Sequence, residues 1–509
     1  MARRSRRFLV SEAAKSEAPK KVSSGNPELD AILKGGFPDN RVCLIEGVPG
    51  SGKTTLAFQF LLNGTRAGEP GLYVTFSEST GELQQVADSH GWSLEGLKLL
   101  ELGALGEKLL PESQYTVFHP AEMELSETTQ RVIDEVNRTK PRRVVIDSLS
   151  EIRLIAREPL RYRRQILALK EILSRCGCTV LFLEDRTSGQ DMLLESIAHG
   201  VVLLEREQAE YGGIRRKLQV VKMRAVDFLD GNHDFAIRRG GLQVFPRLVA
   251  SRTRNSSGVA SKGTLSSNNP DLDALMGSGL PWGTGALIVG PAGTGKSTLA
   301  SSFVSSAAAK GHRASVYLFE ELSTTYLERA QKLGMDLEPH IKNGLVEINQ
   351  IDPAELTPGE FAYKVCQQVD KEKTRLVVID SLNGFMNAMT NERFLLVQMH
   401  ELLSYLNERG VITVLVATQH GVIGSTENTP FELTYLADLV IMIRYFEAES
   451  TVRQAISILK NRRSAHERTI REFEIAKDGI RVGQPLRYFR GILSGIPVYE
   501  GKNSDLLHK

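Results

Sequence analysis

The sequence predicts an α/β protein made of two tandem copies of one domain, each built on a mostly parallel β-sheet flanked by helices. Three observations carry this prediction: a long internal repeat, short apolar runs that alternate with helical patterns, and a glycine-rich loop at the same place in each copy. The chain has 509 residues, which is enough for two such domains of about 230 residues each.

The internal repeat defines the domain organisation. Three segments recur 243 residues further along the chain: Asn26–Ala31 as Asn269–Ala274, Gly36–Pro38 as Gly279–Pro281, and Gly47–Thr54 as Gly290–Ser297. One register held across three separate motifs indicates a tandem duplication. We therefore expect a disordered basic arm at 1–21, a first domain at 22–249, a linker at 250–264, a second domain at 265–497 and a short tail at 498–509.

Short apolar runs mark the expected strands of each sheet. They are apolar on both faces and separated by helical patterns, which is typical of a parallel sheet covered on both sides. In the first domain these runs are 42–45, 72–76, 144–146 and 180–183, and in the second they are 286–289, 316–319, 376–379 and 414–417.

Composition excludes several classes of protein. The 63 basic and 61 acidic residues leave a net charge of +2, which argues against a histone-like nucleic-acid coat. Four cysteines in so long a chain do not make a disulfide framework, and without a CxxC pair a zinc ribbon is not expected. No apolar run reaches the about 18–20 residues of a membrane helix, and the N-terminus lacks a secretory apolar region, so we expect a cytoplasmic protein.

Both glycine-rich loops match the pattern G-x-x-x-x-G-K-[ST], each between an expected strand and an expected helix. Backbone amides of such a loop cradle phosphate oxygens, and the lysine reaches the β- and γ-phosphates. The sequence thus predicts two ATP-binding P-loops, comprising Gly47, Gly50, Ser51, Gly52, Lys53, Thr54 and Thr55 in the first domain and Gly290, Gly293, Thr294, Gly295, Lys296, Ser297 and Thr298 in the second.

A second set of residues points to a magnesium ion beside each loop. The apolar strands 144–146 and 377–379 end in Asp147 and Asp380, where a carboxylate can orient the water shell of Mg²⁺ as in a Walker B motif. Hydroxyl oxygens of Thr54 and Ser297 are the second expected ligands.

Carboxylates that could polarise an attacking water or hydroxyl follow the next strand of each domain. These are Glu78 in the first domain and Glu320 with Glu321 in the second. The repeat offset aligns Glu78 with Glu321 and places Ser77 opposite Glu320, so the two domains are expected to differ in catalytic duty.

Taken together, these motifs resemble the KaiC family within the RecA-like P-loop ATPases, over nearly all of residues 22–497. Further matching segments are Lys222–Arg224, Lys460–Arg462 and 489–497. The resemblance implies a hexameric double ring that hydrolyses ATP, with Mg²⁺, between subunits. It further implies that Lys222 and Arg224 in the first ring, and Lys460 and Arg462 in the second, reach a neighbour's nucleotide.

The resemblance also implies Ser/Thr autophosphorylation by the second domain, with Glu320 as general base. Family acceptors are adjacent Ser and Thr residues a few positions before a strand-leading aspartate, and this chain has Thr434 and Tyr435 before Asp438. Thr434 is therefore the candidate phosphoacceptor, while packing and capping by these two residues stays open. The short tail after Pro497 argues against regulation by a KaiA-type partner, and a KaiB-type partner stays open.

Two other functions compete with a signalling ATPase. A RecA-type DNA recombinase or helicase motor would share the fold and would use the polar Gln419 after a strand, although no DNA-binding module is recognisable and nucleic acid is not an expected partner. A nucleotide-gated scaffold with little turnover is the third alternative, and the glutamates Glu78 and Glu320 argue against it.

Overall fold

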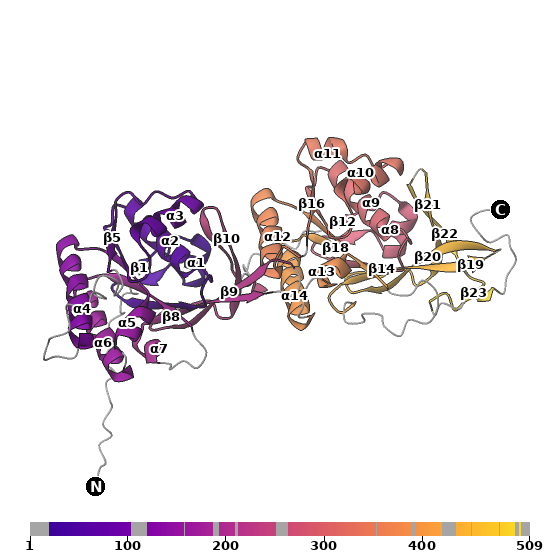
Figure 1. The fold of residues 1–509 in the computed structure, drawn as a ribbon. Helices are drawn as coiled ribbons and strands as arrows, with labels where there is room; N and C mark the ends of the chain where they lie inside the picture. The colour runs from indigo at the N-terminus through magenta and orange to yellow at the C-terminus, as the bar shows by residue number, and fades with distance from the viewer. Residues whose placement is uncertain are drawn as a thin grey trace, which may run out of the picture. The chain divides into compact units, whose positions relative to one another are not determined.

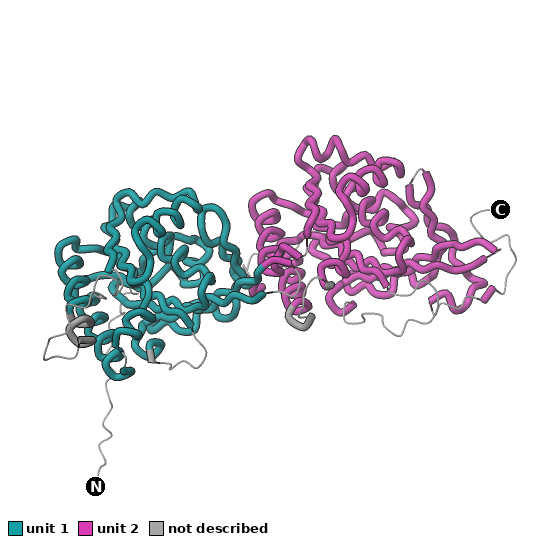
Figure 2. The backbone as a smooth tube through the Cα atoms, viewed as in Figure 1, with its two compact units in different colours: residues 1–209, 214–247 teal, residues 210–213, 248–509 magenta. Residues whose placement is uncertain are grey.

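The computed structural model describes residues 20–102, 120–156, 158–186, 193–208, 212–250, 263–352, 354–387, 392–419, 434–448, 450–477, 479–493 and 498–499. The chain divides into two compact units, Met1–Ala209 with Ile214–Arg247 and Glu210–Gly213 with Leu248–Lys509 (Figure 2). Each unit has its own nine-stranded sheet.

In unit 1 the sheet order is β5-β4-β6-β7-β3-β8-β9-β10-β11. The strands from β5 to β8 run parallel, and β9 to β11 continue the sheet antiparallel. The strands are β1 (Lys21–Val22), β2 (Phe37–Pro38), β3 (Val42–Gly47), β4 (Gly71–Thr75), β5 (Leu97–Glu101), β6 (Arg143–Asp147), β7 (Thr179–Asp185), β8 (Gly200–Gln208), β9 (Ile214–Met223), β10 (Asn232–Arg238) and β11 (Gly241–Phe245). The helices are α1 (Pro27–Ile32), α2 (Lys53–Arg66), α3 (Thr80–His90), α4 (Pro120–Thr139), α5 (Leu149–Ala156), α6 (Pro159–Arg175) and α7 (Leu193–Ile197).

Unit 2 repeats the same order as β16-β15-β17-β18-β14-β19-β20-β21-β22, again with six parallel strands followed by three antiparallel ones. Its strands are β12 (Thr264–Leu265), β13 (Leu280–Pro281), β14 (Gly285–Gly290), β15 (Ala314–Leu318), β16 (Val346–Gln350), β17 (Leu376–Asp380), β18 (Ile412–Thr418), β19 (Leu439–Ala448), β20 (Thr451–Asn461), β21 (Ile470–Ala476), β22 (Gly479–Pro485), β23 (Phe489–Arg490) and β24 (Val498–Tyr499). Its helices are α8 (Pro270–Met276), α9 (Lys296–Ala309), α10 (Ser323–Lys332), α11 (Glu338–Lys342), α12 (Pro358–Glu372), α13 (Leu382–Asn387) and α14 (Glu392–Glu408).

Helices cover both faces of each sheet, which explains why the central strands β4 and β6 are buried at nearly every position (Figure 1). In unit 1, α1–α3 pack on one face and α4–α7 on the other. In unit 2, α8–α11 and α12–α14 divide the two faces in the same way. The predicted fold class, two tandem α/β domains with mostly parallel sheets, is confirmed.

The repeated Asn-Pro segment forms the same helix start in both units. Asn26 Oδ1 accepts a hydrogen bond from the amide of Leu29 at 2.9 Å, and Asn269 Oδ1 accepts one from the amide of Leu272 at 3.0 Å. The proline that follows each asparagine has its fixed φ in the first helical turn, where no amide hydrogen is needed.

The structure extends the sequence prediction in several places. The parallel strands β5, β8, β16 and β19 have no counterpart among the eight predicted strands. The antiparallel strands β9–β11 and β20–β22 have none either, because their alternation of buried and exposed residues is a weaker signal than a continuous apolar run. Residues 1–19 of the expected basic arm lie outside the described residues, but Lys21 lies in β1, where Nζ donates to Leu33 O at 2.7 Å. The expectation of disorder is therefore wrong for Lys21.

Both ends of the expected linker also have defined places. The amide of Ala250 donates to Glu401 Oε2 at 2.7 Å, and Thr264 begins β12. Residues 251–262 lie outside the described residues. Beyond the second domain, Val498 and Tyr499 of the expected tail form β24, which pairs with β23.

Candidate functional site

The first glycine-rich loop joins β3 to α2, as its motif requires. Gly52 directly precedes α2 with φ +105°, a left-handed conformation that turns the loop amides inward and that other residues rarely adopt. Lys53 is the first residue of α2, is buried, and donates from Nζ to Gly47 O at 2.9 Å. The loop is thus wound around its lysine in the form that binds phosphate at a helix N-terminus.

The second loop has the same geometry between β14 and α9. Gly295 precedes α9 with φ +89°, and Lys296 donates from Nζ to Pro291 O at 2.7 Å. Burial lowers the pKa of Lys296 to about 8, opposed by the nearby carboxylates of Asp380 and Glu320. A phosphate group bound beside Lys296 would therefore stabilise the protonated form of its side chain, because it adds negative charge next to the buried ammonium group.

The remaining predicted loop residues occupy equivalent places in the two units. Those with buried side chains at the base of each loop or in the first turn of the helix are Ser51, Thr55, Thr294 and Thr298. The loop glycines Gly50 and Gly293 have φ +74° and +79°. The strand ends Gly47 and Gly290 complete the two sets.

Each expected magnesium pair meets at the carboxyl end of the sheet. Thr54 Oγ1 donates to Asp147 Oδ2 at 3.2 Å in unit 1, and in unit 2 the neighbouring Ser297 hydroxyl partly opposes the rise in the pKa of Asp380. Burial raises the pKa of both aspartates, and Oδ2 of Asp380 is buried without a hydrogen-bond partner. A hydroxyl beside a desolvated carboxylate is a donor set that fits Mg²⁺, which prefers oxygen ligands.

Tyr73 is a site neighbour that the motif search did not find. Its hydroxyl donates to Asp147 Oδ2 at 2.5 Å, and burial together with the Asp147 charge raises the pKa of Tyr73 well above its usual value. Only the pairing of β4 with β6, which sets Tyr73 beside Val145, brings the two groups together.

The candidate glutamates have different surroundings in the two units. Glu78 lies just beyond β4, and burial and the charge of Asp147 raise its pKa. Its Oε2 atom is buried without a hydrogen-bond partner. A carboxylate with a raised pKa beside a phosphate loop is suited to accept a proton from water.

In unit 2, contacts separate the two adjacent glutamates. Ser381 Oγ donates to Glu320 Oε2 at 2.7 Å and accepts from the amide of Gly384 at 3.2 Å. Glu321 instead forms an ion pair with Arg329, a residue of α10. The Ser381 hydroxyl thus fixes Glu320 next to Asp380, whereas Glu321 is held by a cation.

The lysines of the segments Lys222–Arg224 and Lys460–Arg462 make similar contacts with backbone carbonyls of their own chain. Lys222 donates to the carbonyl of Glu195, and Lys460 donates to the carbonyl of Thr434 at 2.7 Å. Both carbonyls lie just before the strand that follows, β8 or β19. Arg224 donates to Ser196 O at 2.8 Å. The expected contact of these two lysines, and of Arg224 and Arg462, with a neighbour's nucleotide stays a prediction.

Thr434 is a half-buried residue five positions before β19. Tyr435 beside it is exposed, with its ring centroid 6.5 Å from that of His400. The Lys460 contact fixes the backbone at the candidate acceptor. The proton transfer expected between the Thr434 hydroxyl and Glu320 stays a prediction.

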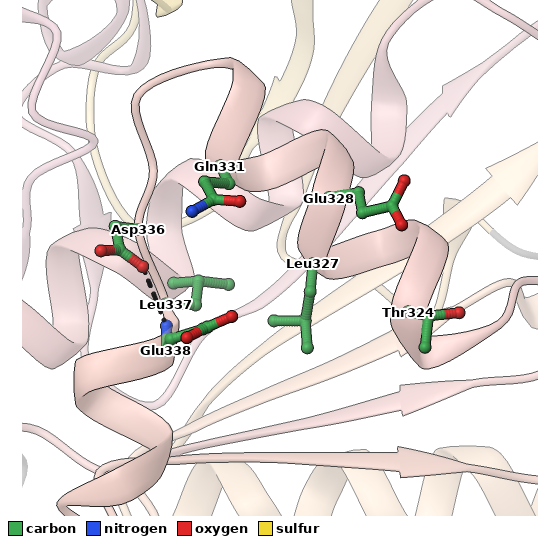
Figure 3. A pocket seen from close by; sticks show the side chains of 7 residues that line it. All are labelled: Thr324, Leu327, Glu328, Gln331, Asp336, Leu337 and Glu338. Atoms are coloured by element: carbon green, nitrogen blue, oxygen red, sulfur yellow. Dashed lines mark hydrogen bonds between the residues drawn. The ribbon is translucent and has the colours of Figure 1, made fainter.

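A pocket of about 190 Å³ is lined by residues of α10, of α11 and of the segment between them (Figure 3), and none of its lining residues belongs to the second phosphate loop. Three carboxylates, those of Glu328, Asp336 and Glu338, lie around it, and the amide of Glu338 donates to Asp336 Oδ1 at 3.2 Å. This hollow is small for a nucleotide and its charge would repel phosphate. It therefore does not compete with the loop as the ATP site.

Within the parts of the chain that the structure describes, no cluster of three or more His, Cys, Asp or Glu residues is arranged to hold a metal ion. Among the same described residues, no helix combines the length and the apolar character needed to cross a membrane.

The fold and the paired loops define a tandem P-loop ATPase. Comparison with known proteins gives the particular family: the model of the KaiC ATPase matches residues 22–249 and 266–487, and the chain belongs to this family. Both domains accordingly carry the nucleotide-binding architecture of a KaiC ATPase.

Curated relatives align over almost the whole chain. The circadian clock oscillator protein KaiC of Synechococcus elongatus is 29% identical over 478 residues, covering 92% of this chain and 90% of the relative. KaiC of Thermostichus vulcanus is 28% identical over 488 residues, covering 94% and 92%. The circadian clock protein KaiC3 of Synechocystis sp. is 27% identical over 489 residues, covering 95% of both.

Proposed function

We propose that this chain hydrolyses Mg·ATP at both of its phosphate loops. The observation that carries the proposal is the same constellation in both units: a buried loop lysine, a hydroxyl next to a desolvated aspartate, and a glutamate beyond the end of the adjacent strand. Lys53 and Lys296 bind the phosphates, while Thr54 with Asp147 and Ser297 with Asp380 hold Mg²⁺. The bound metal ion supplies positive charge that offsets the charge developing on the transferred phosphoryl group.

Glu78 and Glu320 orient and deprotonate the attacking hydroxyl in the first and second domain. The raised pKa of Glu78 favours this role because a general base works best when its pKa approaches the working pH. The Ser381 hydrogen bond fixes the Glu320 carboxylate. Glu321, which is paired with Arg329, acts through charge rather than as the base.

We further propose that the chain assembles as a homohexamer, in which Lys222, Arg224, Lys460 and Arg462 reach the nucleotide of the neighbouring subunit. An ammonium and a guanidinium can stabilise charge on the γ-phosphate. Each lysine would then exchange a carbonyl of its own chain for a phosphate oxygen, which would link nucleotide state to the segments before β8 and β19.

The test of hydrolysis is steady-state ADP release by the full chain with Glu78→Gln, Glu320→Gln and the double variant. Each single variant should lose one part of the turnover, and the double variant should lose at least about a hundredfold, as expected for removal of a general base. Phosphate-loop binding should survive in all three. A double variant with wild-type turnover would overturn the assignment.

Autophosphorylation at Thr434 is a second proposed activity, favoured by the Lys460 bond that fixes the Thr434 backbone. The chain is incubated with Mg·ATP and then analysed by intact mass and peptide mapping. One added phosphate that disappears in Thr434→Ala and persists in Tyr435→Phe supports the proposal. A phosphate that persists in Thr434→Ala, or no added phosphate while ADP is released, contradicts it.

A further inference from the structure

The lysines of the two phosphate loops have different partners. Lys53 Nζ forms an ion pair with Asp185 Oδ1 at 2.8 Å, in addition to its loop carbonyl. Lys296 Nζ donates to a loop carbonyl, that of Pro291, at 2.7 Å. In the first domain a carboxylate therefore already contacts Lys53 Nζ, the atom that must bind phosphate.

Sheet register shows why only the first domain has this carboxylate. Asp185 is the last residue of β7 and pairs in register with Gly47, the first residue of the phosphate loop. In unit 2 the equivalent partner of Gly290 is Thr418, the last residue of β18. The two domains therefore differ at one equivalent position by a full negative charge.

A phosphate group that binds Lys53 comes to lie beside the Asp185 carboxylate. The side chain of Lys53 is 8% exposed and that of Asp185 is 35% exposed, so the repulsion between carboxylate and phosphate is only partly screened by water. A triphosphate places more negative charge near the lysine than a diphosphate does, because the lysine reaches both the β- and the γ-phosphate.

We propose that Asp185 is a specificity-determining residue of the first domain, which competes with the γ-phosphate for Lys53 and so shifts this domain towards the diphosphate relative to the second domain. This inference rests on the proposed function, because it assigns a nucleotide preference to the same phosphate loop. Thr418 imposes no such competition on Lys296, so the second domain keeps the stronger preference for the triphosphate.

The test measures binding of Mg·ADP and of the non-hydrolysable analogue Mg·adenylyl imidodiphosphate to the full chain by titration calorimetry. A Lys296→Ala background leaves the first loop as the reporter. In this background Asp185→Asn should tighten binding of the analogue by about tenfold and of ADP by less, as loss of one partly screened charge repulsion predicts.

The reciprocal change is made in the second loop, in a Lys53→Ala background. Thr418→Asp should weaken binding of the analogue by about tenfold, whereas the uncharged control Thr418→Val should leave it within twofold. The exchange is local, because the backbone of Thr418 is fixed by Asn383 through both its amide and its carbonyl.

The outcomes separate the two proposals. Suppose that the Lys296→Ala and Lys53→Ala chains both bind nucleotide, but that Asp185→Asn weakens binding of the ATP analogue or changes the affinities for the analogue and for ADP by less than twofold. The role of Asp185 is then overturned, while the proposed function stands. If the wild type and both lysine variants bind neither nucleotide, the proposed function fails and this inference fails with it.

Discussion

The hydrogen bond from Ser381 to Glu320 gives a prediction that depends on the structure rather than on a motif. The Ser381 hydroxyl donates to Glu320 Oε2 at 2.7 Å and is itself positioned by the amide of Gly384. Ser381→Ala removes this bond and frees the carboxylate to rotate. A hydrogen bond to a charged group contributes about 1.5–3 kcal/mol, which corresponds to about a 10- to 100-fold change in rate if the bond serves the reactive orientation.

The assay is ADP release by the second domain, in a Glu78→Gln background that silences the first. We expect kcat to fall by about 10- to 100-fold with little change in nucleotide affinity, because Ser381 lies outside the phosphate loop. Ser148→Ala, assayed in a Glu320→Gln background, is the matched control. It removes the equivalent hydroxyl of the first domain, where Ser77 occupies the position of Glu320, and should have a much smaller effect.

The reasoning would be refuted by a Ser381→Ala chain that keeps kcat within threefold of its parent. Equal losses of kcat in Ser381→Ala and Ser148→Ala would also contradict the reasoning, because Ser381 is the serine whose hydroxyl donates a hydrogen bond to a candidate catalytic glutamate, Glu320. A loss of nucleotide affinity without a loss of kcat would place Ser381 in binding rather than in the orientation of Glu320.

Three further predictions concern pH, stability and assembly. Because burial lowers the pKa of Lys296 to about 8, its ammonium group loses its proton as pH rises through that value. Calorimetry on a Lys53→Ala chain should therefore show the affinity for Mg·adenylyl imidodiphosphate falling by up to about tenfold per pH unit above pH 8. An affinity that stays constant up to pH 9.5 would contradict this prediction. Burial also raises the pKa of Glu184 to about 7, so between about pH 4.5 and 7 the folded state holds a proton that the unfolded state releases. The free energy of unfolding should therefore fall by up to about 3 kcal/mol as pH rises through this range. Denaturant titrations should show this decrease in the wild type and a smaller one in Glu184→Gln, and equal decreases would count against the prediction. Lys53→Ala should weaken ATP-dependent assembly measured by mass photometry, and an unchanged distribution of oligomers would argue against nucleotide at the subunit interface.

The sequence was sufficient for the features that depend on local spacing. Both phosphate loops lie between a strand and a helix as predicted, and the eight predicted strands are present in the sheets. Asp147 and Asp380 could be placed beside the loops because neighbouring parallel strands end at one edge of a sheet. The conformation of Gly52 and Gly295 follows directly from the motif.

Features that depend on pairing between distant segments could not be predicted in the same way. Asp185 reaches Lys53 from 132 residues away, and Ser381 reaches Glu320 from 61 residues away. Both contacts depend on strand order and register, which no local pattern encodes. The three antiparallel strands of each sheet were missed because their half-exposed residues lack a strong apolar signal, and the parallel strands β5, β8, β16 and β19 were also not among the eight predicted strands.

The central claim is that one chain carries two working nucleotide sites, one in each repeat. The most direct test counts bound nucleotides per chain with saturating Mg·adenylyl imidodiphosphate in the wild type, Lys53→Ala, Lys296→Ala and the double variant. The structure predicts two, one, one and none. A wild-type chain that binds a single nucleotide, or a double variant that still binds two, would contradict the account.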